Sequence, residues 1–245
     1  MSRIRPFVLV ASLFVVGCGS TPAPSVGPSA VGPSAVATAS PATAPPASTP
    51  SPSAAAIPSP TAARELVAGS APLPAGPYTV GAFRPPVIFT VEDGWVAGTV
   101  SPGFFDVQQD RGTPDVVAVQ FARVDGMVGA SGSTDEPKSA EAAAEAIRQN
   151  PGVVVIEESG SKVGGLDGLN VTIENQGAAH APLMKVSAGT LGIDPKRRLW
   201  VSLFDTQDGV LAVMVGGSVA TWDHALATAE PVLESIWTEM QGTAP

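Results

Sequence analysis

The stretch that decides the fold is Leu199-Trp200-Val201-Ser202-Leu203-Phe204, followed after a short connection by Val210-Leu211-Ala212-Val213-Met214-Val215. Both segments are rich in the β-branched and apolar residues typical of strands. The connection, Asp205 to Gly209, ends in an Asp-Gly pair that suits the positive φ values of a hairpin turn. We therefore predict an antiparallel hairpin. The second segment is apolar at nearly every position, so we expect it to be buried on both faces in the middle of a sheet.

Other segments along the chain also have the pattern of strands. The segment 116–124 is well supported, because Val117, Val119 and Phe121 fall on one face. In the segment 169–174, apolar residues alternate with Asn170 and Thr172, as in a strand with one face in water. A polar, Gly-rich loop is expected over 125–137. The remaining strands are expected at 78–83, 87–91, from 95 onward, 104–109, 153–156 and 184–188.

Two helices are predicted. Ser139 is a suitable N-cap for a helix that ends before Asn150-Pro151-Gly152 and carries a stripe of small apolar residues. Thr221 is the expected N-cap of a second amphipathic helix that reaches Met240, with Pro231 predicted to bend or divide it. Strands with one helix inserted and one closing the chain indicate an α+β fold, in which an antiparallel β-sheet is flanked by helices.

Three segments, together with the helix predicted after Ser139, resemble the PsbP-like domains, a family that includes actinobacterial lipoproteins of the LpqN type. They are Phe89-Thr90-Val91-Glu92-Asp93-Gly94-Trp95, the Gly-Gly-x-x-Gly run from Gly164 to Gly168, and Val232-Leu233-Glu234-Ser235-Ile236. Glu92 stands where such domains usually have proline. The resemblance covers about residues 78–240. It implies a sandwich of an antiparallel sheet between helices and a noncatalytic binding or assembly role.

The N-terminus has the pattern of an export signal. Arg3 and Arg5 precede an apolar run from Phe7 to Val16 that is too short to span a bilayer. The segment Val15-Val16-Gly17-Cys18 resembles the bacterial lipobox, which implies cleavage after Gly17 and lipidation of the Cys18 thiol. Two or three acyl chains would hold the protein at the extracytoplasmic face of the cell membrane. The alternative is a plain secretory signal that happens to end in a cysteine.

Residues 19–63 contain no charged and no aromatic residue and consist almost entirely of Ala, Pro, Ser, Thr, Gly and Val. Such a segment cannot bury enough apolar surface to offset its ordering entropy, so we predict a disordered linker. As polyproline II, about 45 residues would extend to roughly 140 Å. The predicted organisation is therefore a signal peptide over 1–17, lipidated Cys18 and a linker over 18–63, and a single globular domain over 64–245 whose core covers about 78–240.

Composition excludes several functions. The chain has a net charge of −9, and removal of Arg3 and Arg5 with the signal makes it about −11. This charge disfavours nucleic acid as a partner. Cys18 is the only cysteine. The domain therefore has no disulfide, no thiol nucleophile and no cysteine-based metal site.

The candidate catalytic residues form no recognised motif. The two histidines, His180 and His224, lack the spacing of metal ligands. Ser159 and Lys162 have S-x-x-K spacing but lie between predicted strands, whereas that chemistry needs a helix. The remaining candidates have ordinary structural explanations: neighbouring carboxylates on a strand (Glu157, Glu158), hairpin-turn aspartates (Asp205, Asp208), a solvated strand end (Lys196, Arg197, Arg198) and an incidental Asn-x-Thr triplet at Asn170.

These patterns favour a membrane-anchored protein with a noncatalytic binding or accessory domain, without cofactor or metal. The partner would be an envelope component, another protein or an apolar ligand, held by the exposed side of the sheet or the loops at its rim. The alternative is a cell-envelope hydrolase with an unrecognised site. A cleft that joins His180 or His224 to a carboxylate or serine would favour the enzyme, whereas a dry apolar groove would favour binding.

Overall fold

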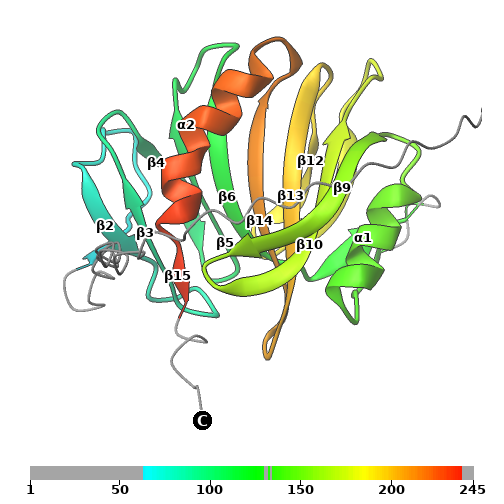
Figure 1. Ribbon diagram of the computed structural model, residues 1–245, viewed down its shortest axis with the longest axis horizontal. Coiled ribbons are helices and arrows are strands. Elements are labelled where there is room, and N and C mark those ends of the chain that lie inside the picture. The colour runs from blue at the N-terminus through cyan, green and yellow to red at the C-terminus, as the bar shows by residue number, and fades with distance from the viewer. Residues whose placement is uncertain (1–62, 130–131, 133, 239–245) are drawn as a thin grey trace, which may run out of the picture. The chain divides into compact units, whose positions relative to one another are not determined.

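The structure is a computed structural model that describes residues 63–129, 132 and 134–238. The predicted signal peptide, Cys18 and linker lie outside these residues. The central element is a seven-stranded sheet with the order β4-β5-β6-β14-β13-β10-β9, in which every neighbouring pair is antiparallel (Figure 1). Its strands are β4 (Val96–Ser101), β5 (Phe104–Gln109), β6 (Val117–Arg123), β9 (Val154–Val163), β10 (Leu166–Glu174), β13 (Arg197–Thr206) and β14 (Gly209–Ser218).

Two smaller sheets and two helices accompany the central sheet. One small sheet contains β1 (Arg64–Glu65), β2 (Gly76–Thr79), β3 (Val87–Val91) and β15 (Trp237–Thr238). The other contains β7 (Gly126–Val128), β8 (Thr134–Asp135), β11 (Ala181–Val186) and β12 (Gly189–Ile193). The helices are α1 (Ala140–Arg148) and α2 (Trp222–Glu234). The predicted α+β class, an antiparallel sheet flanked by helices, is confirmed.

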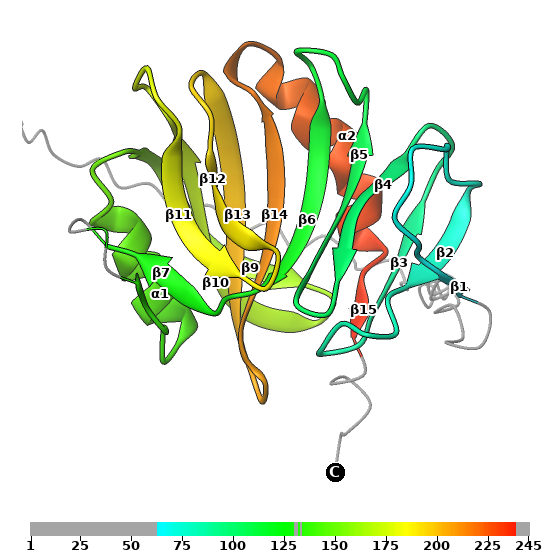
Figure 2. The ribbon, with the colours of Figure 1, turned by 180° about the vertical axis from the view of Figure 1, so that it is seen from behind.

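The central sheet is covered on both faces, as Figures 1 and 2 show from opposite sides. On β14, Leu211, Val213 and Val215 belong to a buried cluster that includes residues of α2 and β3. The alternate residues of β14 belong to a second cluster that includes α1 and β11. Burial on both faces, which the apolar run 210–215 predicts, is therefore confirmed. The two helices pack on opposite faces of one sheet.

The hairpin of β13 and β14 has a shorter connection than the sequence predicts. β13 and β14 pair from Arg197–Ser218 to Thr206–Gly209, so only Gln207 and Asp208 remain unpaired. Of the predicted Asp-Gly pair, only Gly209 has a positive φ, of 107°. A glycine there accommodates the backbone conformation that the turn requires.

The predicted loop over 125–137 is wrong in part, because it contains strands β7 and β8. Met127 is buried and pairs with Met184 of β11. This pairing extends the small sheet that packs with α1. The sequence pattern does not predict β7, because three residues are too few to show the alternation typical of a strand.

The second helix is shorter than predicted. It runs through Pro231 as one helix and ends at Glu234. The carbonyl that proline leaves without a donor belongs to Ala227, which is solvent-exposed. The Ser235 hydroxyl accepts a hydrogen bond from the Thr90 N–H at 2.7 Å and donates to the Val232 carbonyl, so it joins the helix end to β3. Two residues later the chain forms β15 beside β3.

Candidate functional site: a pocket at the rim of the sheet

Three connecting segments enclose a pocket of about 480 Å³ at one rim of the domain, which we call the rim pocket. They are the chain after β7, the turn between α1 and β9, and the loop between β10 and β11. The volume is within the range of small-molecule sites in proteins. The described lining residues are Val128, Gly129, Gly132, Asn150, Pro151, Gly152, Val153, Val154, Asn175, Gln176, Gly177, Ala178, Ala179, His180, Ala181 and Pro182.

Asn150 fixes one wall of the rim pocket. Its side-chain amide donates to the Pro182 carbonyl at 2.8 Å, and its side-chain oxygen accepts from the Gly152 N–H at 2.8 Å. The first bond ties the turn after α1 to β11, and the second closes a local Asx turn. Gly152 is required at this position, because a Cβ there would lie 2.8 Å from the Ala181 Cβ.

Asn175 fixes the opposite wall in the same way. It is 1% exposed, and its amide donates to the carbonyls of Ala179 and Ile193, each at 2.8 Å. Its side-chain oxygen accepts from the Gly177 N–H at 2.8 Å. The loop between β10 and β11 is thus held in one conformation by its first residue. The two asparagines therefore hold two walls of the pocket in place before any ligand arrives.

The lining of the rim pocket is predominantly apolar, and His180 is its only ionisable residue among those described. The His180 Nδ1 lies 2.8 Å from the Asp194 Oδ1, and both side chains are largely exposed. The imidazole also packs against Gly192, where an added Cβ would collide with it. The pocket therefore suits an uncharged, apolar group with a polar contact at His180.

The other candidate residues do not join His180. His224 is exposed in the first turn of α2 and lines a separate open depression with Arg198 and Trp222. Ser159 and Lys162 both lie on β9, where Lys162 forms an ion pair with Asp167 at 3.4 Å. The pair was predicted to lie between strands, but β9 extends to Val163 and contains both residues. The S-x-x-K spacing on a strand cannot provide the helical arrangement of that chemistry.

The carboxylate candidates have structural partners. Glu158 pairs with Arg148 of α1. Asp205, predicted as an ordinary turn residue, instead accepts a hydrogen bond from the Ala140 N–H at 2.7 Å and so caps α1. The Asp208 backbone N–H donates to the Thr206 hydroxyl. Across the described residues, no group of three or more His, Cys, Asp and Glu side chains could hold a metal ion.

The basic segment 196–198 is more than a solvated strand end, so that prediction is wrong. Arg197 donates to the carbonyls of Val116 at 2.7 Å and Pro114 at 3.1 Å, and its burial lowers the pKa of the guanidinium. Arg198 pairs with Glu174 at 2.9 Å and lies over the Trp222 ring. Both side chains reach partners from distant segments, which a single sequence does not reveal.

Asn170 is 5% exposed within β10, so the Asn-x-Thr triplet is not presented as a glycosylation acceptor. Its side-chain oxygen is buried and has no hydrogen-bond partner within the described chain. Thr172 is also 5% exposed. The polar face predicted to be wet is therefore largely buried, because it faces inward beside Ser202, which is fully buried.

Of the residues that shape the rim pocket, the sequence patterns indicate His180 but not Asn150 and Asn175. A local signal was present, because Asn150-Pro151-Gly152 and Asn175-Gln176-Gly177 both place glycine two residues after asparagine, as an Asx turn favours. Cys18 lies outside the described residues. Within the described residues, no helix is long and apolar enough to cross a membrane.

No model of a known protein family matches the chain, and no curated protein matches it. The solution structure of cyanobacterial PsbP from Synechocystis is 12% identical, with a TM-score of 0.37, over 67% of this chain and 92% of that chain. LpqN, described as involved in cell envelope biogenesis of Mycobacterium tuberculosis, is 12% identical, with a TM-score of 0.36, over 68% of this chain and 88% of that chain. Likenesses of this extent assign neither family nor function.

Proposed function

We propose that the chain is a lipid-anchored extracytoplasmic protein whose folded domain is a noncatalytic binding or accessory module, and that the rim pocket is its binding site. The observation that carries the proposal is the pocket itself. It has a volume of about 480 Å³, a predominantly apolar lining and one ionisable lining residue, His180, among those described. Such a site receives an uncharged group by excluding water from apolar surface.

The anchor is proposed from the sequence alone. The N-terminus has the features of a lipoprotein signal: two arginines (Arg3 and Arg5), an apolar run and the lipobox-like Val15-Val16-Gly17-Cys18. The uncharged segment 19–63 would then extend the domain away from the membrane. This arrangement gives a binding module access to envelope components or to another protein, while its negative charge keeps nucleic acid away.

Preorganisation supports binding as the role of the rim pocket. The side chains of Asn150 and Asn175 form hydrogen bonds that hold the loops of the pocket walls in place. Because the loops need no ordering when a ligand enters, little of the interaction energy is lost to conformational entropy. The lining also contains no serine, threonine, lysine or carboxylate among the described residues, so the lining itself offers no ordinary nucleophile.

The proposal is tested by filling the pocket. Ala179 is exposed and lines it, so Ala179→Trp should occupy the space, whereas Ala227→Trp places the same side chain on the exposed face of α2. With the neutral dye Nile red as probe, we expect fluorescence enhancement by the unmodified protein and by the Ala227 variant. The Ala179 variant should bind at least tenfold more weakly. Equal binding by all three proteins would reject the rim pocket as the site.

A hydrolase is the second candidate, and the contact between His180 and Asp194 favours it. A carboxylate 2.8 Å from one ring nitrogen orients the imidazole, and the other nitrogen could then remove a proton from water. Both side chains are largely exposed, and the pocket supplies no second catalytic group among its described residues. Binding is therefore the preferred function.

A further inference from the structure

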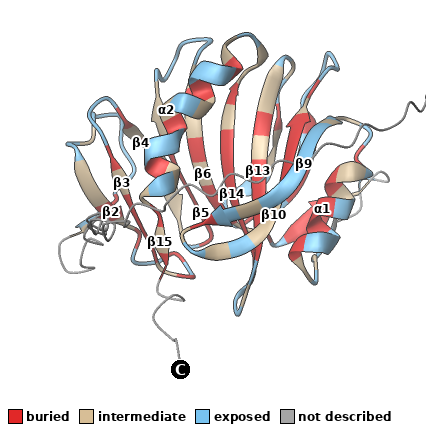
Figure 3. Cartoon of the chain, viewed as in Figure 1, coloured by how far each residue is buried: buried red, intermediate tan, exposed pale blue. Residues whose placement is uncertain are grey.

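Strand β9 forms one edge of the central sheet. It pairs with β10, and no second strand lies beside it within the described residues. Seven of its ten residues are exposed, Val155 and Ser161 are partly buried, and Val163 is buried. Figure 3 shows the strand mostly in the exposed colour. An open edge of this length is a template for an additional strand.

The hairpin geometry shows which main-chain groups face the open edge. Gly164 and Gly165 have φ values of 57° and 75° and form a two-residue turn between β9 and β10. Such a turn is closed by a hydrogen-bonded pair of residues, here Val163 with Leu166. Along the two strands, non-hydrogen-bonded and hydrogen-bonded pairs then alternate. Glu158, Gly160 and Lys162 fall in the non-hydrogen-bonded pairs, so their N–H and C=O groups point away from β10.

The start of β9 carries apolar side chains at this edge. Val154 is 44% exposed and Ile156 is 45% exposed, and they are two of the three large hydrophobic residues that are exposed in the described chain. Val154 also lines the rim pocket. Ile156 is the extra residue of a β-bulge, since Thr172 pairs with Glu157 and Ile173 with Val155. The open edge and the rim pocket therefore form one continuous surface.

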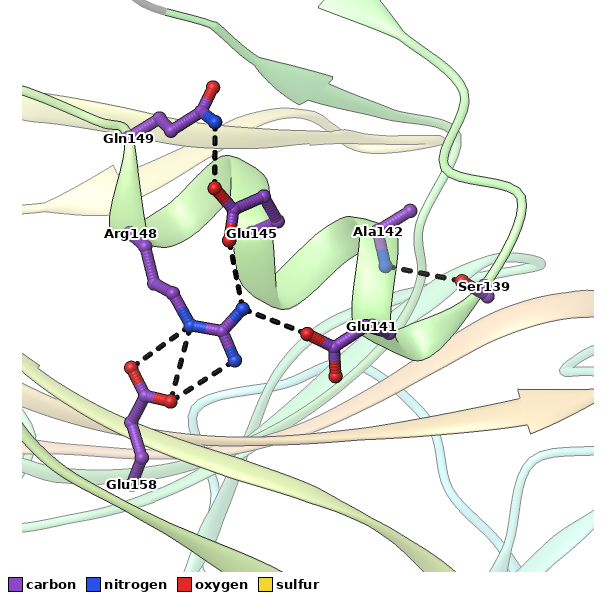
Figure 4. A network of polar contacts seen from close by, with 7 residues as sticks. All are labelled: Ser139, Glu141, Ala142, Glu145, Arg148, Gln149 and Glu158. Carbon is purple, nitrogen blue, oxygen red and sulfur yellow. Dashed lines mark hydrogen bonds and ion pairs between the residues drawn. The ribbon is translucent and has the colours of Figure 1, made fainter.

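The middle of β9 is acidic. Arg148 of α1 binds Glu158, Glu141 and Glu145 at 2.9 to 3.0 Å, as Figure 4 shows. These three carboxylates, led by Glu158, raise the pKa of the Arg148 guanidinium. Glu157 pairs with Thr172 of β10 and so points to the opposite face of the sheet. One guanidinium against three carboxylates leaves about two negative charges, which favour a positively charged partner.

We propose that β9 binds an extended peptide as an added strand, with an apolar side chain of the peptide in the rim pocket and a basic side chain beside Glu158. The main-chain groups of β9 supply affinity and the pocket supplies selectivity, as in other cases of strand addition. Val154 and Glu158 are four positions apart, about 13 Å along a strand. The peptide's apolar and basic residues should therefore be separated by three or four positions.

A second copy of this chain is the weaker occupant. It would bring another bulge at Ile156 and another pair of acidic residues to the edge, and bulges and charges oppose pairing between like edges. This proposal identifies the partner of the rim pocket and so rests on the proposed function. Its test must therefore report on β9 separately from the pocket.

Gly160 allows that separation. A Cβ at this position meets no atom within 4 Å, so both alanine and proline have room at the Cβ. Gly160→Pro removes an N–H that faces the open edge, a position where sheets tolerate proline, whereas Gly160→Ala keeps the N–H. The probe is a random decapeptide library displayed on phage, selected against the whole folded protein. Selected peptides are then synthesised for affinity measurements.

We expect selected peptides to share the apolar and basic pattern, to bind the Gly160→Ala variant within about twofold of the unmodified protein, and to bind the Gly160→Pro variant at least tenfold more weakly. In the unmodified protein, bound peptide should slow amide hydrogen exchange at Glu158, Gly160 and Lys162. This second measurement applies even if the proline variant does not fold.

Equal peptide binding by the two folded Gly160 variants, unchanged exchange at those amides, or a library that yields no binder would overturn the proposal. Nile red distinguishes this failure from failure of the proposed function, because the proline variant keeps every lining residue of the rim pocket. If the proline variant still binds the dye and both Gly160 variants bind the peptide equally, strand addition is rejected and the rim pocket remains the binding site. Dye binding indifferent to Ala179→Trp would reject the pocket instead.

Discussion

The Asp205 carboxylate accepts a hydrogen bond from the Ala140 backbone N–H at 2.7 Å, so the end of β13 caps the first turn of α1 from 65 positions away. Ser139 caps a second donor of the first turn by accepting from the Ala142 N–H at 3.1 Å. The helix thus begins with one local and one distant cap. The distant cap fixes α1 to the hairpin that forms the centre of the sheet.

Asp205→Ala should lower the free energy of unfolding by about 1 kcal/mol, the usual value of a helix cap, because the Ala140 N–H loses its acceptor. Asp208→Ala is the matched control, since Asp208 lies in the same hairpin turn and is exposed. Urea unfolding of the two variants measures the difference. An equal effect of both substitutions would show that the Asp205 contact does not stabilise α1.

Asp106 is a buried carboxyl whose ionisation should be visible in stability. Its two oxygens accept from the Thr99 N–H at 2.7 Å and the Gln108 amide at 2.5 Å. Burial raises the pKa of Asp106, and the hydrogen bonds from Thr99 and Gln108 oppose that shift without cancelling it. The protonated form is therefore favoured in the folded state relative to the unfolded chain.

Because the pKa of Asp106 is raised on folding, its contribution is fully present below the unfolded pKa of about 3.9 and is lost as the pH rises through the folded pKa. Asp106→Asn does not titrate, so it should gain stability relative to the unmodified protein as the pH rises from about 4 to 7. Exposed Glu92 provides the control variant, Glu92→Gln. A stability difference for Asp106→Asn that stays constant over this range would contradict the raised pKa.

Local patterns predicted the elements that are fixed by local chemistry. The strand 87–91 and the strand 104–109 have the expected bounds, and α1 begins after Ser139 with four buried residues on its predicted stripe. The hairpin of β13 and β14 was also identified, because the two runs of six residues on either side of its connection are nearly all apolar or β-branched. In each case the signal lies within one segment.

Contacts between distant segments account for what was missed. α2 ends at Glu234 because Ser235 binds Thr90, and β15 then pairs with β3. Arg197 donates to the Val116 carbonyl just before β6, and Arg198 pairs with Glu174 of β10. Because these partners are distant in the sequence, the positive charge alone suggested that both side chains were solvent-exposed. The rim pocket is formed by three connecting segments, and no periodic pattern in the sequence indicates that they lie together. Only His180 among its residues was predicted as a candidate site.

The hydrolase alternative predicts that His180 and His224 matter to a reaction. We expect His180→Ala with His224→Ala to leave any turnover of envelope-derived ester and amide substrates unchanged, since the rim pocket offers no second catalytic group among its described residues. Ser159→Ala serves as an additional test on β9. Loss of a measurable hydrolytic activity from a folded variant would replace the binding function with the enzyme.

The anchor makes its own prediction. Cys18→Ser should abolish labelling by a fatty-acid probe and leave an unprocessed or freely secreted protein, because only a thiol accepts the diacylglycerol of a lipoprotein. Cell fractionation with metabolic labelling measures both properties. Continued labelling of the serine variant at unchanged membrane association would contradict lipidation at Cys18.

The most direct test of the binding function is site-specific photocrosslinking in the full-length protein on living cells. A photoreactive amino acid at Ala179 lies in the rim pocket, and the same amino acid at Ala227 lies on the exposed face of α2. We expect one dominant adduct from position 179, reduced when a second substitution, Ala178→Trp, fills the pocket, and no corresponding adduct from position 227. The same adducts from both positions, or none from position 179, would contradict the rim pocket as the contact surface.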